Sequence, residues 1–105
     1  MPEKEFTKPI GASEENRLGL KIVTERGVLM DVMVQYEAFV RGEWLPIVRY
    51  DTAHGFPHRD VLHPNKTEDK HPLSFPDLKT FVSYTEQDLK DRWEWYRQRF
   101  LKEMK

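Results

Sequence analysis

The residues most able to do chemistry in this chain are its histidines, all four of which fall between positions 54 and 71. Imidazole exchanges protons near neutral pH and is also the commonest metal ligand. Three of the histidines are interleaved with acidic residues, whose carboxylates orient and charge an imidazole. In chain order the cluster reads Asp51-x-x-His54-x-x-x-His58-x-Asp60-x-x-His63, with His71 following.

The most specific interpretation of this cluster is acid and base catalysis without a metal. We expect His54 and His58 to transfer protons while Asp51 and Asp60 orient them. Arg49, just before the cluster, would hold a phosphate or an anionic transition state. Such a set of side chains cleaves RNA without a cofactor, and we expect none.

Two other interpretations use the same atoms. Two histidines with Asp51 or Asp60 would make a three-ligand metal site with an open position, although the spacing matches no familiar metal motif. A purely structural role has the same weight as the functional interpretations together, because histidine and aspartate in a loop with glycine and proline often cap turns through side-chain hydrogen bonds to the backbone.

Alternating apolar residues predict the strands that position the cluster. They cover residues 18–24, 28–40, 44–50 and 58–63, and the second is long enough to need a bend or bulge. On this map His58 and Asp60 share a face, and His63 points away from His58. Residues 64–72 are turn-rich and charged, so we expect His71 in a solvent loop.

The hairpin around Arg41-Gly42-Glu43 has two possible registers. A three-residue loop places Trp44 and Tyr50 on the face of residues 34–40, whereas a two-residue loop places Leu45 and Arg49 there. Pro46 cannot donate to a ladder, which indicates an edge or bulged position.

A long helix is predicted at the C-terminal end. Ser83-x-x-Glu86 matches a capping box, with Thr85 as an alternative cap, and residues 75–84 before it fit either a helical turn or a strand. One apolar stripe runs along the helix and is expected to cover the sheet: Leu89, Trp93, Tyr96 and Phe100.

The fold class that follows is α+β, with an antiparallel meander of about four strands and one long C-terminal helix packed on one face. Residues 1–16 lack any periodicity and are expected to form a flexible arm, with residues 17–105 as the single domain.

Composition narrows the class of protein. Seventeen basic and 18 acidic residues give a net charge of -1, so any contact with nucleic acid needs a local basic patch. There is no cysteine, hence no disulfide, and no apolar run approaches the roughly 20 residues of a membrane helix. We therefore expect a cytoplasmic protein that does not bind membranes.

Trp95 falls off the apolar stripe of the helix, between Arg92 and Arg99. These three residues are the candidate partner-binding surface, for a homodimer, for an antitoxin-like protein or for RNA whose base stacks on the indole. The alternative is local, with an arginine lying over the indole as a cation-π pair.

The cluster also resembles the TumE-type toxins of bacterial and archaeal toxin-antitoxin pairs. The shared string is Arg49-Tyr50-Asp51, then Ala53 and His54, then Phe56-Pro57-His58, about ten residues in all. Arg59 stands where that family has a second histidine, and the aromatic helix differs. The resemblance implies a small toxin-like protein that acts on RNA and pairs with an antitoxin.

Overall fold

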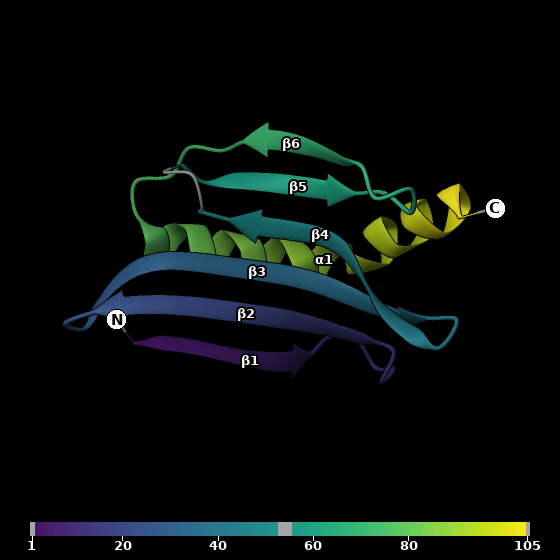
Figure 1. Ribbon diagram of the computed structural model, residues 1–105, viewed down its shortest axis with the longest axis horizontal. Coiled ribbons are helices and arrows are strands. Elements are labelled where there is room, and N and C mark those ends of the chain that lie inside the picture. The colour runs from purple at the N-terminus through teal and green to yellow at the C-terminus, as the bar shows by residue number, and fades with distance from the viewer. Residues whose placement is uncertain (1, 53–55, 105) are drawn as a thin grey trace.

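The computed structural model describes residues 2–52 and 56–104, which form one antiparallel sheet and one helix (Figure 1). The α+β class with a C-terminal helix on an antiparallel sheet is confirmed, but the sheet has six strands rather than about four, in the order β1-β2-β3-β4-β5-β6. The elements are β1 (Glu3–Pro9), β2 (Asn16–Glu25), β3 (Val28–Val40), β4 (Glu43–Asp51), β5 (His58–Leu62), β6 (Glu68–Pro72) and α1 (Leu78–Glu103).

The two unexpected strands are the edges of the sheet. Part of the expected flexible arm pairs with β2 as β1, where Phe6 lies opposite Leu20. Part of the expected solvent loop pairs with β5 as β6, and every residue of β6 is exposed. Charged edge strands bury little apolar surface, so they carry no alternation to detect, and their backbone hydrogen bonds hold them in place.

Two-residue turns connect the central strands. Arg26 and Gly27 join β2 to β3, and Arg41 and Gly42 join β3 to β4. All four have positive φ, at 51°, 78°, 52° and 86° in chain order. Positive φ at both central residues defines the turn that matches the twist of a hairpin, and glycine adopts it without strain.

The β3–β4 register combines the two alternatives. Near the turn, Leu45 lies opposite Ala38, as a two-residue loop requires. A bulge between Tyr36 and Glu37 then shifts the pairing, so that Val48 lies opposite Tyr36. Since a one-residue shift exchanges the faces of a strand, the bulge lets both halves of β4 turn apolar side chains toward the helix.

The helix begins earlier than its predicted caps. Asp77 is the N-cap, with an extended backbone, and its Oδ1 accepts a hydrogen bond of 2.7 Å from the Thr80 backbone N–H. The prediction that Ser83 or Thr85 caps the helix is therefore wrong, because both residues lie inside α1. The bond from Thr80 lowers the pKa of Asp77, as expected for a carboxylate at a helix start.

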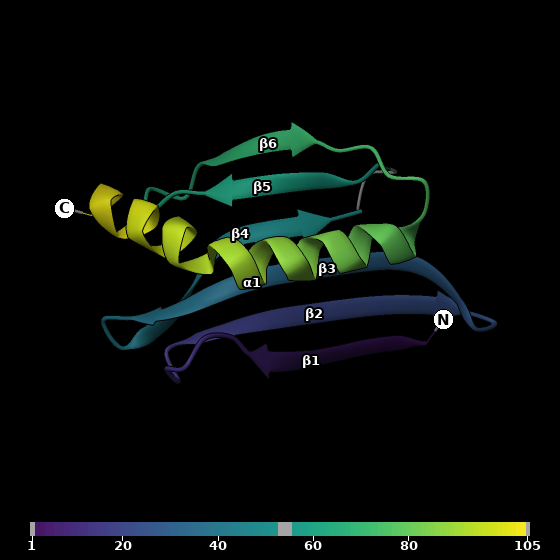
Figure 2. The ribbon, with the colours of Figure 1, turned by 180° about the vertical axis from the view of Figure 1, so that it is seen from behind.

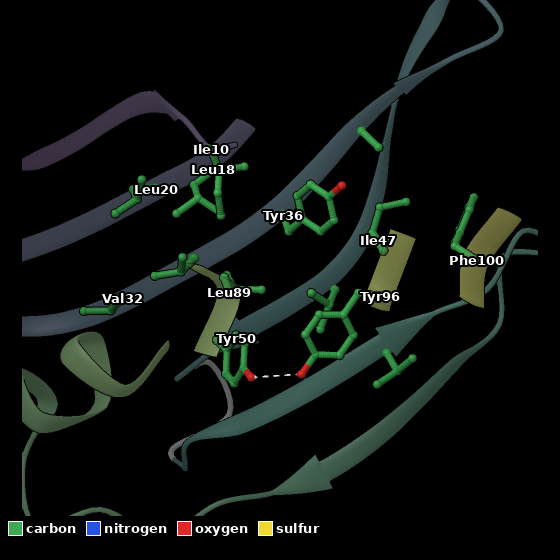
Figure 3. Close-up of a cluster of buried hydrophobic side chains, with 14 of the residues drawn as sticks. Ile10, Leu18, Leu20, Val32, Tyr36, Ile47, Tyr50, Leu89, Tyr96 and Phe100 are labelled. Carbon is green, nitrogen blue, oxygen red and sulfur yellow. Dashed lines mark hydrogen bonds between the residues drawn. The ribbon is translucent and has the colours of Figure 1, made fainter. Parts of the chain in front are cut away.

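The core lies between α1 and the middle strands. We call the sheet face under the helix the inner face and the opposite one the outer face. Figure 2 shows α1 in front of β3, with β5 and β6 to one side of it. The buried apolar side chains that α1 contributes to the core are Phe81, Leu89, Tyr96 and Phe100. Figure 3 shows several of their partners in the sheet.

Candidate functional site

The predicted cluster forms on the outer face, across β4 and β5. Arg49 lies opposite Asp60, and Asp51 lies opposite His58. Because the residues between them on each strand point to the helix, these four side chains share one face. The fifth predicted member, His54, lies outside the described residues.

His58 and Asp60 form a buried pair within this cluster. His58 Nε2 lies 3.4 Å from Asp60 Oδ2, and the two side chains are 2% and 4% exposed. His58 Nδ1 donates to the Phe56 carbonyl oxygen over 3.2 Å, so both ring nitrogens have a partner. Asp60 Oδ1 has only Lys70 Nζ nearby, at 3.9 Å, and no hydrogen bond among the described residues.

A row of polar contacts extends from the cluster across the outer face. Arg49 Nε donates to Gln35 Oε1 over 2.8 Å, and Gln35 Nε2 donates to Glu37 Oε2 over 2.6 Å. Arg17 Nε completes the row at 2.6 Å from Glu37 Oε1, with its guanidinium 4.0 Å from the Trp44 ring. This row holds the Arg49 side chain in place. Neither of the two terminal nitrogens of Arg49 has a hydrogen-bond acceptor within residues 2–52 and 56–104.

The other two histidines lie away from this pair. His63 bonds to Asp69 Oδ2 and to Glu103 Oε1 of α1, both over 2.8 Å. The bond to Asp69 raises the pKa of His63, and that to Glu103 adds to the effect. His71, expected in a loop, lies in β6 opposite Arg59.

A second polar constellation lies on the inner face, at the middle of the helix. Tyr50 and Tyr96 both donate from their hydroxyls to Asp88 Oδ2, the latter over 2.8 Å. The two hydroxyl oxygens lie 3.5 Å apart and face each other, as the dashed line in Figure 3 indicates. Arg92 closes the network, with Nε 2.9 Å from Asp88 Oδ1 and a terminal nitrogen donating to the Tyr96 hydroxyl over 2.6 Å. Burial, more than the bonds to these partners, raises the pKa of Tyr50.

Arg59 extends the same network from β5. Burial opposes its charge, but a side-chain hydrogen bond to Tyr50 and nearby negative charge leave its pKa raised. Its Nε is buried without a hydrogen-bond partner in the described chain. One signal in the sequence could have found this network, because Asp88, Arg92 and Tyr96 recur every four residues on one side of a helix.

Beside this network the surface between α1 and strands β5 and β6 is rich in cations and aromatic rings. Trp95 is 53% exposed, with the guanidinium carbons of Arg92 and Arg99 at 5.2 and 5.9 Å from its ring centroid. The bond to His63 lowers the pKa of Asp69, and the proximity of Arg99 adds to the effect. We call this surface the basic flank; it consists of Arg59, His71, Tyr84, Arg92, Trp95 and Arg99.

A metal centre has no support from the described residues, in which no three histidine or acidic side chains are grouped as ligands would be. Nor does any helix in the described ranges have the length and apolarity to span a bilayer.

The chain belongs to a family defined by a domain of unknown function, DUF7718, whose model matches residues 1–105. No curated protein matches the chain, and no solved structure does.

Proposed function

We propose that this DUF7718 domain acts on RNA by binding a single strand along the basic flank. The observation that carries the proposal is the half-exposed Trp95 ring between Arg92 and Arg99. A base stacks on an indole whatever its identity, and flanking arginines meet the phosphates on either side.

The arginines of the flank differ in what they can offer a ligand. Arg92 is held by Asp88 and Tyr96, so it is a fixed part of the surface. Arg99 has no hydrogen bond or ion pair with the described residues, which leaves its planar fork available to a phosphate. The acids nearby pair with other groups of the protein, Asp88 with Arg92 and Asp69 with His63, and neither forms an ion pair with Arg99.

The flank also has the length that a strand of RNA needs. Tyr84, which is 42% exposed, lies eleven positions before Trp95 on the helix. At a rise of 1.5 Å per residue, the two rings are separated by roughly 16 Å along the axis. Two aromatic platforms with cations between them favour an extended chain of nucleotides over a compact ligand.

A protein partner is the competing occupant, whether an antitoxin-like protein or a second copy of the chain. The sheet edges favour neither, because β1 and β6 carry charges and end in Pro9 and Pro72, devices that block strand addition. The surface around Trp95 is the remaining contact for a partner, and Arg99, which forms no ion pair with the described residues, favours a polyanion there.

The test is fluorescence anisotropy of a labelled single-stranded RNA of about a dozen nucleotides, at several salt concentrations. We expect Trp95→Ala to weaken binding by about 1 to 3 kcal/mol and Arg99→Gln to lower the salt slope by about 0.7. Lys90→Gln, with the same charge change on the opposite side of the helix, should bind like the parent. Equal effects of the two charge variants, or concentration-dependent self-association without RNA binding, would refute the proposal.

A second candidate function is RNA cleavage of the toxin type at the outer-face cluster. It is favoured by the register that brings Arg49, Asp51, His58 and Asp60 together. In this proposal the imidazole of His58, with His54, transfers protons and Arg49 holds the phosphate. Since both nitrogens of His58 are occupied, its bond to the Phe56 carbonyl must open first.

Cleavage is tested by incubating RNA with the protein between about pH 6 and 8, where imidazole titrates. Loss of cleavage in His58→Ala, with cleavage retained in Lys90→Gln, supports the second candidate. Circular dichroism must show that both variants are folded. RNA left intact by the parent protein, or cut equally by folded His58→Ala, contradicts it.

A further inference from the structure

A cavity opens where strands β4 and β5 diverge. Their pairing runs from Asp51 and His58 to Val48 and Val61, so the first half of β4 has no strand of the described chain on its β5 side. The last turns of α1 lie at this gap, in front of the sheet in Figure 2, between the β3–β4 hairpin and the β5–β6 turn. The cavity has a volume of about 450 Å³, within the range of about 300 to 1,000 Å³ typical of small-molecule sites.

The walls of the cavity are mainly apolar and come from all three surrounding segments. The bulged start of β4, the end of β5 with its turn, and the end of α1 each contribute two side chains. They are Leu45, Pro46, Leu62, Pro64, Phe100 and Met104.

One cationic group at the cavity is held ready for a ligand. Arg49 lines it, and the hydrogen bond from Nε to Gln35 fixes the side chain without using the two terminal nitrogens. His63 also lines the cavity, but Asp69 and Glu103 occupy both of its ring nitrogens. His63 therefore lines the cavity without offering a ring nitrogen to a ligand, and its bond to Glu103 connects α1 to the β5–β6 turn.

Acidic residues at the same cavity restrict the charge of the occupant. Glu43 and Glu68 line it together with Arg49 and Lys66, so the fixed charges nearly balance. A polyanion such as RNA or a nucleoside triphosphate would be repelled by the two glutamates. A single carboxylate fits the arginine fork through two parallel hydrogen bonds and brings only one charge.

We propose that this cavity binds a small monocarboxylate with an apolar body, its carboxylate on Arg49 and its body against Leu62 and Phe100. No residue of the basic flank lines this cavity, and its ligand class differs from RNA, so this proposal and the proposal of RNA binding at the flank succeed or fail independently. The cavity shares Arg49 with the second candidate function, and the naphthoate titration is read without RNA so that it tests the cavity alone.

The probe is 2-naphthoate, an aromatic monocarboxylate, titrated into protein labelled with ¹³C at the methionine methyl groups. The four methionines include Met104 in the cavity, whereas Met30 and Met33 lie on β3 and line no part of it. Assignment of the Met104 signal comes from Met104→Leu. We expect the Met104 signal to move saturably while those of Met30 and Met33 stay in place.

Two comparisons decide the role of Arg49. Arg49→Gln should weaken binding by roughly tenfold to a hundredfold, the range for a lost pair of charge-assisted hydrogen bonds. Lys90→Gln also removes one positive charge, on α1 and outside the lining of the cavity, and should bind like the parent. The neutral 2-naphthamide should bind the parent as weakly as naphthoate binds Arg49→Gln.

The proposal is overturned if the Met104 signal shows no saturable shift at millimolar naphthoate. It is also overturned if the amide binds as tightly as the acid, or if Lys90→Gln weakens binding as much as Arg49→Gln. A folded Arg49→Gln, verified by its unchanged Met30 and Met33 signals, keeps loss of structure from imitating loss of binding.

Discussion

The buried pair of His58 and Asp60 should be worth several kcal/mol to the fold when only one partner is removed. In His58→Leu, the Asp60 carboxylate stays 4% exposed with no hydrogen bond from the imidazole. Its remaining cation is Lys70 at 3.9 Å, whose side chain is 39% exposed. Leaving a buried polar group without its partner costs about 1 to 3 kcal/mol, and more for a charged group, so with the residual contact to Lys70 we expect about 3 kcal/mol.

The double variant gives the sharper test of this reasoning. Replacing both partners by apolar residues leaves no unpaired charge, and such replacements are often neutral or stabilising. We therefore expect His58→Leu with Asp60→Leu to be more stable than His58→Leu alone, a coupling of about 1 to 3 kcal/mol.

The assay is urea unfolding near pH 7, followed by tryptophan fluorescence and circular dichroism, with the free energy of unfolding extrapolated to water. His71→Leu is the matched control, because this histidine lies in the fully exposed β6 and should change stability by less than about 0.5 kcal/mol. The reasoning is refuted if His58→Leu costs less than about 1 kcal/mol, or if the double variant loses the sum of the two single losses.

Three further predictions concern the packing of the helix. The fold raises the pKa of His63, so its contribution to stability is complete below the unfolded pKa of 6.5 and is lost as the pH rises through the folded pKa. The urea midpoints measured at about pH 6 and 8.5 should therefore differ more in the parent protein than in His63→Gln. Gly11→Ala should cost about 1 to 3 kcal/mol in urea unfolding, because φ is +74° and a Cβ would lie 2.6 Å from Trp93 Cζ2. Asp77→Ala should lower the urea midpoint through loss of the N-cap, and Asp77→Asn should restore it, since an asparagine oxygen accepts the same bond.

The shared face of the outer cluster could be predicted from the sequence because it depends only on strand periodicity. Once β4 ends near Asp51 and β5 begins at His58, the i, i+2 spacing places His58 and Asp60 on one face. Their burial could not be predicted, since it results from neighbours such as Phe56, whose ring centroid lies 5.4 Å from that of His58.

The inner-face network was missed for a different physical reason. Tyr50 and Tyr96 each fit an apolar pattern, which says that a ring is buried but not what its hydroxyl meets. Their common partner Asp88 is 38 residues from Tyr50 in the chain, and only the packing of α1 across β4 brings the three oxygens together.

The sheet separates the two places where RNA is proposed to act. The basic flank belongs to the inner side, with Arg59 pointing to the helix, whereas His58 and Asp60, its neighbours on β5, point to the outer face. An RNA strand stacked on Trp95 therefore has the sheet between its phosphates and the His58 imidazole. If the domain both binds and cleaves RNA, the two activities must separate by mutation: Arg99→Gln should weaken binding at the flank and leave cleavage at saturating RNA unchanged, and folded His58→Ala should do the reverse. A single variant that abolishes both while folded would mean that one of the two surfaces has been assigned wrongly.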